Sequence, residues 1–320
     1  MTDHLLQLSG IIVDLIYEVE KVPLAGEEAI VNDLYMSAGG GFNAMVAARR
    51  AQMPATYGGS LGQGPLADMV RQQLCKEDIS TLQVTQGARD QGCCTVLVDA
   101  SGERTFIAKE GAEGTVSTEQ LAQINPTRFN WVLVSGYTLV YKQSRDAVAE
   151  WIDQLPSSSK LVFDPCPLVA SIPKPLLHKV MNKCSWLSCN MLEARHLSDT
   201  TDAAAAATQL LNSQPNLTGV VVRQGELGCV LATSSDNPLT IPGYPVSAID
   251  TNGAGDAHIG TFIATLAGGA EPEAACTIAN AAAALSTTFK GPATTPPLPD
   301  VQAYISRFAS DNDIESTQPH

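Results

Sequence analysis

Short apolar runs alternate along this chain with longer segments in which apolar residues recur every three or four positions. The runs have four to nine residues and are bounded by turn residues, which is typical of β-strands. Several are apolar throughout, so the sequence predicts an α/β fold with a mainly parallel sheet covered by helices on both sides. The predicted strands are Leu5–Val13, Ala55–Leu61, Trp131–Ser135, Leu161–Asp164, Trp186–Cys189 and Val220–Arg223, and the predicted helices are residues 43–53, 65–76, 143–154, 202–213, 254–267 and 271–287.

Two further segments have strand chemistry but interrupt this alternation. They are Ala29–Met36 and Gly92–Lys109, and the second reads as a hairpin that turns at Asp99–Gly102. We expect them to pair into a small antiparallel sheet that stands off the main body as a lid, with lid strands at about residues 12–36 and 90–110.

Composition and charge narrow the possible functions. The 320 residues are enough for one large domain, expected over residues 1–308, and the polar end at residues 309–320 is expected to be frayed. A net charge of −14 without a basic cluster argues against a nucleic-acid partner. The eight cysteines form no CxxC pair, and neither an export signal nor an apolar stretch of membrane-spanning length is evident. We therefore expect a cytoplasmic protein with no membrane contact.

The segment Asp250-Thr-Asn-Gly-Ala-Gly-Asp256 carries the most informative chemistry, because it is a glycine-rich turn that opens a predicted helix. Gly253, Ala254 and Gly255 can present backbone N–H groups to an anion at the positive end of the helix dipole. Asp256 would repel a bound phosphate, but it could accept a proton from an attacking hydroxyl group. The alternative is that Asp256 only caps the helix.

A second glycine-rich segment precedes the first predicted helix. Gly39, Gly40 and Gly41 would leave one wall of a pocket without side chains, and Asn43 offers hydrogen-bond donors and acceptors for sugar hydroxyls. Alone, the segment could equally be a flexible turn with Asn43 as a helix cap.

Together these two segments resemble the two signatures of the ribokinase-like (PfkB) carbohydrate kinases, and the resemblance spans about residues 5–308. It implies a three-layer αβα sandwich with a β-sheet lid that closes over a sugar. It also implies ATP-dependent phosphorylation of a hydroxymethyl group, with Asp256 as the catalytic base and the amides of Gly253, Ala254 and Gly255 stabilising the transferring phosphoryl group.

The resemblance extends to other expected ligand contacts. Asp14 would bind substrate hydroxyls together with Gly39, Gly40, Gly41 and Asn43. The sequence Asn190-Met-Leu-Glu193 matches the family's NxxE motif, in which Glu193 would organise Mg²⁺ through water. The remaining expected residues are Arg223, Gly225, Gly228 and Asn280 beside ATP, and Asp250, Asn252, Gly291 and Thr295 around a potassium ion.

The sequence departs from ribokinases proper at Gly40, where those enzymes have lysine, so ribose is in doubt as the acceptor. A free sugar is favoured because the predicted lid has few aromatic residues, among them Tyr35 and Phe106, on which a nucleobase could stack. A nucleoside kinase and a non-catalytic sugar or nucleotide sensor stay open as alternatives, as does a homodimer formed through the lid.

Overall fold

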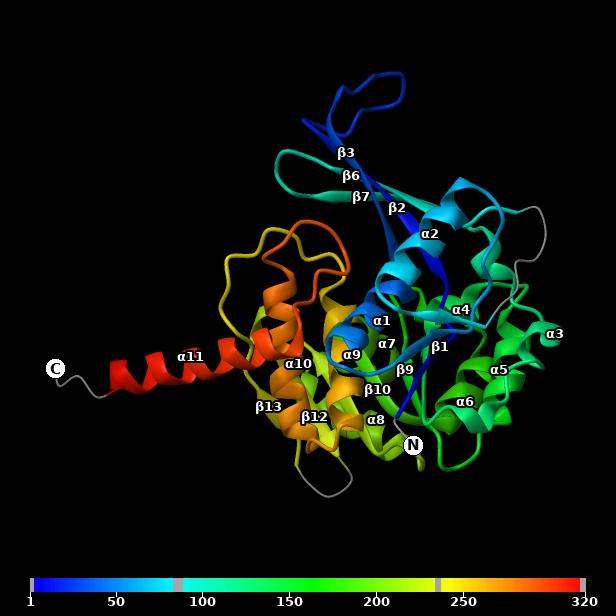
Figure 1. Cartoon of the computed structure of the whole chain (residues 1–320). Helices are drawn as coiled ribbons and strands as arrows, with labels where there is room; N and C mark the ends of the chain where they lie inside the picture. The colour runs from blue at the N-terminus through cyan, green and yellow to red at the C-terminus, as the bar shows by residue number, and fades with distance from the viewer. Residues whose placement is uncertain (1–2, 83–88, 234–236, 317–320) are drawn as a thin grey trace.

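A computed structural model of the chain describes residues 3–82, 89–233 and 237–316, with side chains up to residue 310. Within these residues a nine-stranded sheet lies between two layers of helices, and a four-stranded sheet projects from the body (Figure 1). The three-layer α/β fold predicted from the sequence is thereby confirmed.

The large sheet has the order β13-β12-β11-β10-β9-β8-β1-β4-β5 among the described residues. It is parallel from β11 to β5, and only β12 and β13 add antiparallel strands at one edge. All parallel strands therefore end at the same edge, where loops can converge. The strands are β1 (Leu5–Gln7), β4 (Ala55–Tyr57), β5 (Ser80–Thr81), β8 (Trp131–Ser135), β9 (Lys160–Asp164), β10 (Cys184–Asn190), β11 (Gly219–Arg223), β12 (Cys229–Thr233) and β13 (Leu239–Ile241).

Alternating side chains of these strands supply two separate cores. In β1, Leu5 packs into one core and Leu6 into the other, and both are fully buried. The helices that cover the Leu5 face are α1 (Gly41–Arg50), α2 (Pro65–Lys76), α9 (Ala254–Ala267) and α10 (Pro272–Ser286). The helices on the Leu6 face are α3 (Thr118–Leu121), α4 (Gly136–Val140), α5 (Arg145–Asp153), α6 (Lys174–Lys183), α7 (Met191–Ser198) and α8 (Ala203–Ser213).

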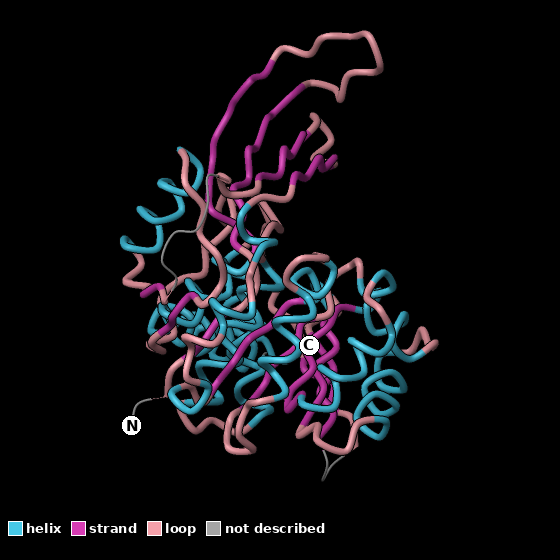
Figure 2. Tube along the Cα trace, turned by 90° about the vertical axis from the view of Figure 1, so that its right-hand side faces the viewer, coloured by secondary structure: helices cyan, strands magenta, loops and turns pink. Residues whose placement is uncertain are grey.

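The four-stranded sheet, called the lid sheet from here on, has the order β3-β2-β6-β7. Figure 2 shows its strands rising together from the body. The predicted hairpin turn is present, since the amide of Gly102 donates to the carbonyl of Asp99 over 2.9 Å. The two off-pattern segments therefore belong to one small sheet, but they do not pair with each other, because β2 lies between β3 and β6. The expectation of an antiparallel sheet is wrong for one pair, since β2 and β6 run parallel while β2–β3 and β6–β7 are antiparallel. The strands are β2 (Ile11–Val19), β3 (Val31–Gly40), β6 (Cys93–Val98) and β7 (Arg104–Lys109).

The predicted single strand Leu5–Val13 is wrong, because the chain passes from one sheet to the other within it. β1 belongs to the large sheet and β2 to the lid sheet. The break includes Gly10, where a Cβ would lie only 2.9 Å from Cγ of the buried Glu113, so the absence of a side chain permits this close crossing. Gln7, Ser9 and Gly10 interrupt the apolar residues at the break, but the apolar residues alone could not reveal it, since both strands contribute buried residues.

The chain end also differs from the expectation. Helix α11 (Leu298–Ser316) continues through most of the segment that was expected to be frayed, and residues 317–320 lie outside the described residues. A helix already begun gains one backbone hydrogen bond for each added residue, which requires no apolar stripe. Among the described residues, the structure contains no helix with the length and apolar character needed to span a membrane.

Candidate active site

The glycine-rich turn before α9 forms one wall of the site. Gly253 caps this helix with a left-handed backbone, φ 77°, which favours glycine. Helix α9 begins at Ala254, whose N–H group donates to the Thr251 carbonyl over 3.3 Å, and the N–H groups that follow in the first turn have no carbonyl partner within the helix. The turn and the first residues of α9 line a cavity of about 750 Å³, where these N–H groups can meet an anion.

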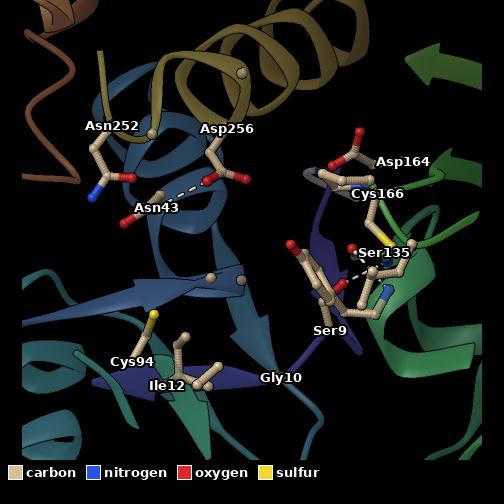
Figure 3. A pocket seen from close by; sticks show the side chains of 18 of the residues that line it. Ser9, Gly10, Ile12, Asn43, Cys94, Ser135, Asp164, Cys166, Asn252 and Asp256 are labelled. Carbon is tan, nitrogen blue, oxygen red and sulfur yellow. Dashed lines mark hydrogen bonds between the residues drawn. The ribbon is translucent and has the colours of Figure 1, made fainter. Parts of the chain in front are cut away.

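Asp256 lies in the first turn of α9 and is held by Asn43 of α1. The Asn43 Nδ2 atom donates to Asp256 Oδ2 over 3.0 Å (Figure 3). Burial, followed by the negative charge of Asp164, raises the pKa of Asp256 to about 7. A carboxylate with that pKa is suited to accept a proton near neutral pH.

Asn43 has a second polar atom that faces the same region. The residue is 3% exposed, and its Oδ1 atom has no hydrogen-bond partner among the described residues. A buried acceptor without a partner is unfavourable unless a ligand or water satisfies it. Because Asn43 lines the cavity, a substrate hydroxyl is a suitable donor.

Asp14 enters the cavity from β2 at the base of the lid sheet. Gly39 of the adjacent strand β3, which pairs with Ile12, makes this possible, because a Cβ on Gly39 would lie 2.3 Å from Asp14 Oδ2. Burial raises the pKa of Asp14 to about 6, and a hydrogen bond with Asn252 opposes that rise. Gly39 thus makes room for a carboxylate, although it does not itself line the cavity.

A charged cluster lines the same cavity where β9, β10 and β11 end. The Arg223 guanidinium donates to Asp164 Oδ1 over 2.9 Å, and its Nη2 atom lies 3.7 Å from Glu193 Oε2. Asn190 and Glu193 form a capping box at the start of α7, in which Asn190 donates to both Glu193 oxygens. Burial and the charge of Asp164 raise the pKa of Glu193 to about 6, against the effect of Arg223.

Most of the residues chosen from the sequence converge on this one cavity. The predicted residues that line it are Asp14, Gly40, Gly41, Asn43, Asn190, Glu193, Arg223, Asn252, Gly253, Ala254, Gly255 and Asp256. The predicted residues that do not line it are Gly39, Gly225, Gly228, Asn280, Asp250, Gly291 and Thr295.

Asn280, expected beside the adenine, has structural contacts instead. It is 5% exposed, and its Nδ2 atom donates to the carbonyls of Ile241 and Pro242 over 3.1 Å each. Its Oδ1 atom lies 3.1 Å from His258 Nε2, and the His258 ring is stacked on Phe262. These contacts fix the end of β13 against α9 and α10.

Sequence reasoning missed four charged residues that line the cavity, Arg104, Lys109, Glu110 and Asp164. Asp164 ends the apolar strand β9, and a polar residue at the carboxyl end of a parallel strand could have indicated it. Arg104 lies in β7 and lines the cavity from the lid sheet, but its local sequence carries no signal of that role.

Sequence comparison relates the chain to one family of known proteins. The sequence model of the pfkB family of carbohydrate kinases matches residues 3–300. The chain belongs to this family. The ribokinase-like resemblance noted from the two glycine-rich segments is therefore confirmed.

Individual relatives match more than four fifths of the chain. An uncharacterised sugar kinase of Escherichia coli is 29% identical over 283 residues, which are 88% of this chain and 87% of that protein. A fructokinase of Vibrio alginolyticus is 29% identical over 282 residues, 83% of this chain and 89% of that protein. The crystal structure of a ribokinase from Thermotoga maritima superposes with a TM-score of 0.80 at 21% identity, covering 96% of this chain and all of the other.

Proposed function

We propose that this pfkB-family protein transfers the γ-phosphoryl group of ATP to a hydroxymethyl group of a small sugar. The observation that carries the proposal is the position of Asp256. It combines a raised pKa, a hydrogen bond from Asn43 and a place at the positive end of α9, beside backbone amides that can hold a phosphate.

The reaction follows from these positions. The acceptor CH₂–OH lies between Asp14 and Asp256, and Asp256 takes its proton while the oxygen attacks the γ-phosphorus in line. The bond from that phosphorus to the bridging oxygen breaks, and ADP leaves with the electron pair. The amides of Gly253, Ala254 and Gly255 stabilise the charge on the transferring group.

The carboxylates of Asp164 and Glu193, both paired with Arg223, are the groups that would order the water shell of a magnesium ion. Both Glu193 oxygens already accept hydrogen bonds from Asn190, so this carboxylate is placed to order water molecules rather than to ligate the ion directly. Among the described residues no group of three or more His, Cys, Asp or Glu side chains could hold a metal, which suits an ion that binds mainly through phosphates and water. When bound, Mg²⁺ supplies charge neutralisation for the phosphates.

The residues expected around potassium do not fit that ion. Potassium would need a place beside the Asp250 carboxylate, and the positively charged guanidinium of Arg104 already takes that place, while the amides of Asn252 and Gly291 hold the carboxylate in position. We therefore leave potassium out of the mechanism.

The acceptor is inferred from the polar groups that face it. Asp14 and the Oδ1 atom of Asn43 offer acceptors for several hydroxyl groups, which a simple alcohol could not satisfy. Of the residues lining the cavity, Phe106, Tyr137 and Tyr141 are aromatic, and Tyr35 does not line it. A sugar is accordingly preferred, and a nucleoside is the second candidate because three rings are available for stacking.

The test is a panel of pentoses, hexoses, sugar acids and nucleosides, each incubated with MgATP and the purified protein. ADP release is followed, and products are identified by mass. We expect a sugar phosphate as the product with the highest kcat/KM. A nucleoside monophosphate formed with a much higher kcat/KM would replace the sugar by a nucleoside, and no phosphorylated product from any panel would favour a sensor.

We also propose a homodimer through the lid sheet, because large apolar side chains are exposed on it. Leu34 and Met36 of β3 are 50% and 53% exposed, and Phe106 and Ile107 of β7 are 60% and 61% exposed. Light scattering after gel filtration should give twice the mass of 33.7 kDa. The Leu34→Lys variant should be a monomer, and a monomeric parent protein would remove the proposal.

A further inference from the structure

Arg104 connects the lid sheet to the glycine-rich turn at residues 250–256, which is called the catalytic turn from here on. It is the first residue of β7, and its guanidinium donates through Nη2 to Asp250 Oδ1 and through Nη1 to Thr251 Oγ1, the latter over 3.3 Å. Both acceptors lie in the segment that leads into Gly253. The Arg104 side chain is 23% exposed and that of Asp250 is 10% exposed, so the ion pair is largely shielded from water.

The Asp250 carboxylate joins three segments through these contacts. Its Oδ1 atom also accepts from the amide of Asn252 over 2.8 Å, and its Oδ2 atom accepts from the amide of Gly291 over 2.9 Å. The two amides hold the catalytic turn against the loop that follows α10. Arg104 connects the lid sheet to the same carboxylate. Of these three donors to Asp250, Arg104 carries a full positive charge, whereas the two amides are neutral.

A positive charge at this point matters because the surroundings are acidic. Asp14 and Asp256 face the same cavity, and the charge of Asp250 raises the pKa of Asp14. Without a cation beside it, Asp250 would add its negative charge to a site that must accept the phosphates of ATP. The Arg104 guanidinium offsets that charge without a bound ion.

We propose that Arg104 is a positioning residue that supplies the cation for Asp250 from the lid sheet, so that the protein needs no potassium or other monovalent ion there. This inference rests on the proposed kinase function. It follows that the catalytic turn has its complete set of contacts only while β7 lies over it, because the charge belongs to the lid sheet and not to the body.

Lys290 offers a matched control, because it is a second cationic contact between the lid sheet and the body. Its Nζ atom pairs with Glu18 of β2 and Asp33 of β3, and it lies 4.8 Å from the centre of the Tyr35 ring. None of these partners belongs to the catalytic turn. Replacing Lys290 therefore loosens the lid sheet without exposing the Asp250 carboxylate.

The experiment compares the parent protein with Arg104→Met and Lys290→Met in potassium, sodium and tetramethylammonium chloride at equal ionic strength. The first readout is the melting temperature, which requires no turnover. The melting temperature of the parent should be the same in all three salts, and so should that of Lys290→Met. Arg104→Met should melt at a higher temperature in potassium than in the other two salts, because an ion that binds only the folded protein raises its melting temperature. The second readout is kcat, which should fall about tenfold in Arg104→Met in sodium and partly recover in potassium.

Each of three results would overturn the proposal. The first is a rise in the melting temperature of the parent that only potassium causes, and the second is an Arg104→Met protein that potassium affects in neither readout. The third is a Lys290→Met protein that responds to potassium as Arg104→Met is expected to respond. If Arg104→Met does not fold, Arg104→Lys keeps the charge and should stay insensitive to potassium; a potassium response there contradicts the proposal. If no acceptor is phosphorylated, the proposed function fails, but the melting temperatures still decide the role of Arg104.

Discussion

Replacing Asp256 by asparagine should make the protein more stable while it abolishes most activity. The asparagine keeps an oxygen that can accept the hydrogen bond from Asn43 Nδ2, so the main effect is the loss of a charge. Because the side chain is partly buried beside Asp164, its charged form is unfavourable, and this is the reason that its pKa rises from 3.8 to about 7. The same electrostatics that make Asp256 a proton acceptor therefore destabilise the folded protein.

The size of the effect follows from the pKa. A rise of about three units at 1.36 kcal/mol per unit sets a ceiling of about 4 kcal/mol. The carboxylate keeps part of its surface in water, which reduces the expected gain to about 2 kcal/mol. With an unfolding entropy of about 2.1 cal/mol/K per residue, the variant should melt about 3 °C higher at pH 8.

The sign of the pH dependence provides the decisive check. A carboxyl group with a raised pKa in the folded state contributes no destabilisation below its unfolded pKa of 3.8 and the full amount above about pH 7. The advantage of Asp256→Asn should therefore shrink to less than half between pH 8 and pH 5. Differential scanning calorimetry at both pH values measures this, and a variant that is less stable than the parent at pH 8 would refute the reasoning. Its kcat should fall at least ~10²-fold.

Further predictions concern the pH profile, the metal and the packing. The kcat/KM of the parent should rise with pH through about 7, because Asp256 must be deprotonated to accept a proton; a flat profile from pH 5.5 to 8 would exclude it as the base. Glu193→Gln should raise the Mg²⁺ concentration needed for half-maximal rate, and an unchanged titration would place Glu193 outside the site. Asp14→Asn should raise KM for the acceptor about tenfold or more with little change in KM for ATP, as initial rates would reveal. Gly260→Ala should lower the unfolding free energy by about 1–3 kcal/mol in urea titrations. The new methyl carbon would lie 2.2 Å from the Ala44 carbonyl oxygen and force α9 away from α1, so an unchanged urea midpoint would argue against that close packing.

Local sequence determined much of the fold and the nature of the catalytic turn. The predicted helix at residues 254–267 agrees with the bounds of α9, since apolar periodicity and a glycine-rich start are both local properties. The turn at Asp99–Gly102 followed from residue types in the same way. Even the lid sheet could be inferred, because its strands interrupt the alternation of strands and helices.

The tertiary structure alone decided which distant side chains meet. Asn43 and Asp256 are 213 residues apart and Arg104 and Asp250 are 146 apart, and both pairs depend on how the lid sheet and α1 pack near α9. The break at Gly10, which divides one apolar run between two sheets, likewise depends on the buried side chain of Glu113. Periodicity records whether a residue is buried, but not which neighbour buries it, so the charge that neutralises Asp250 became evident only from the packed structure.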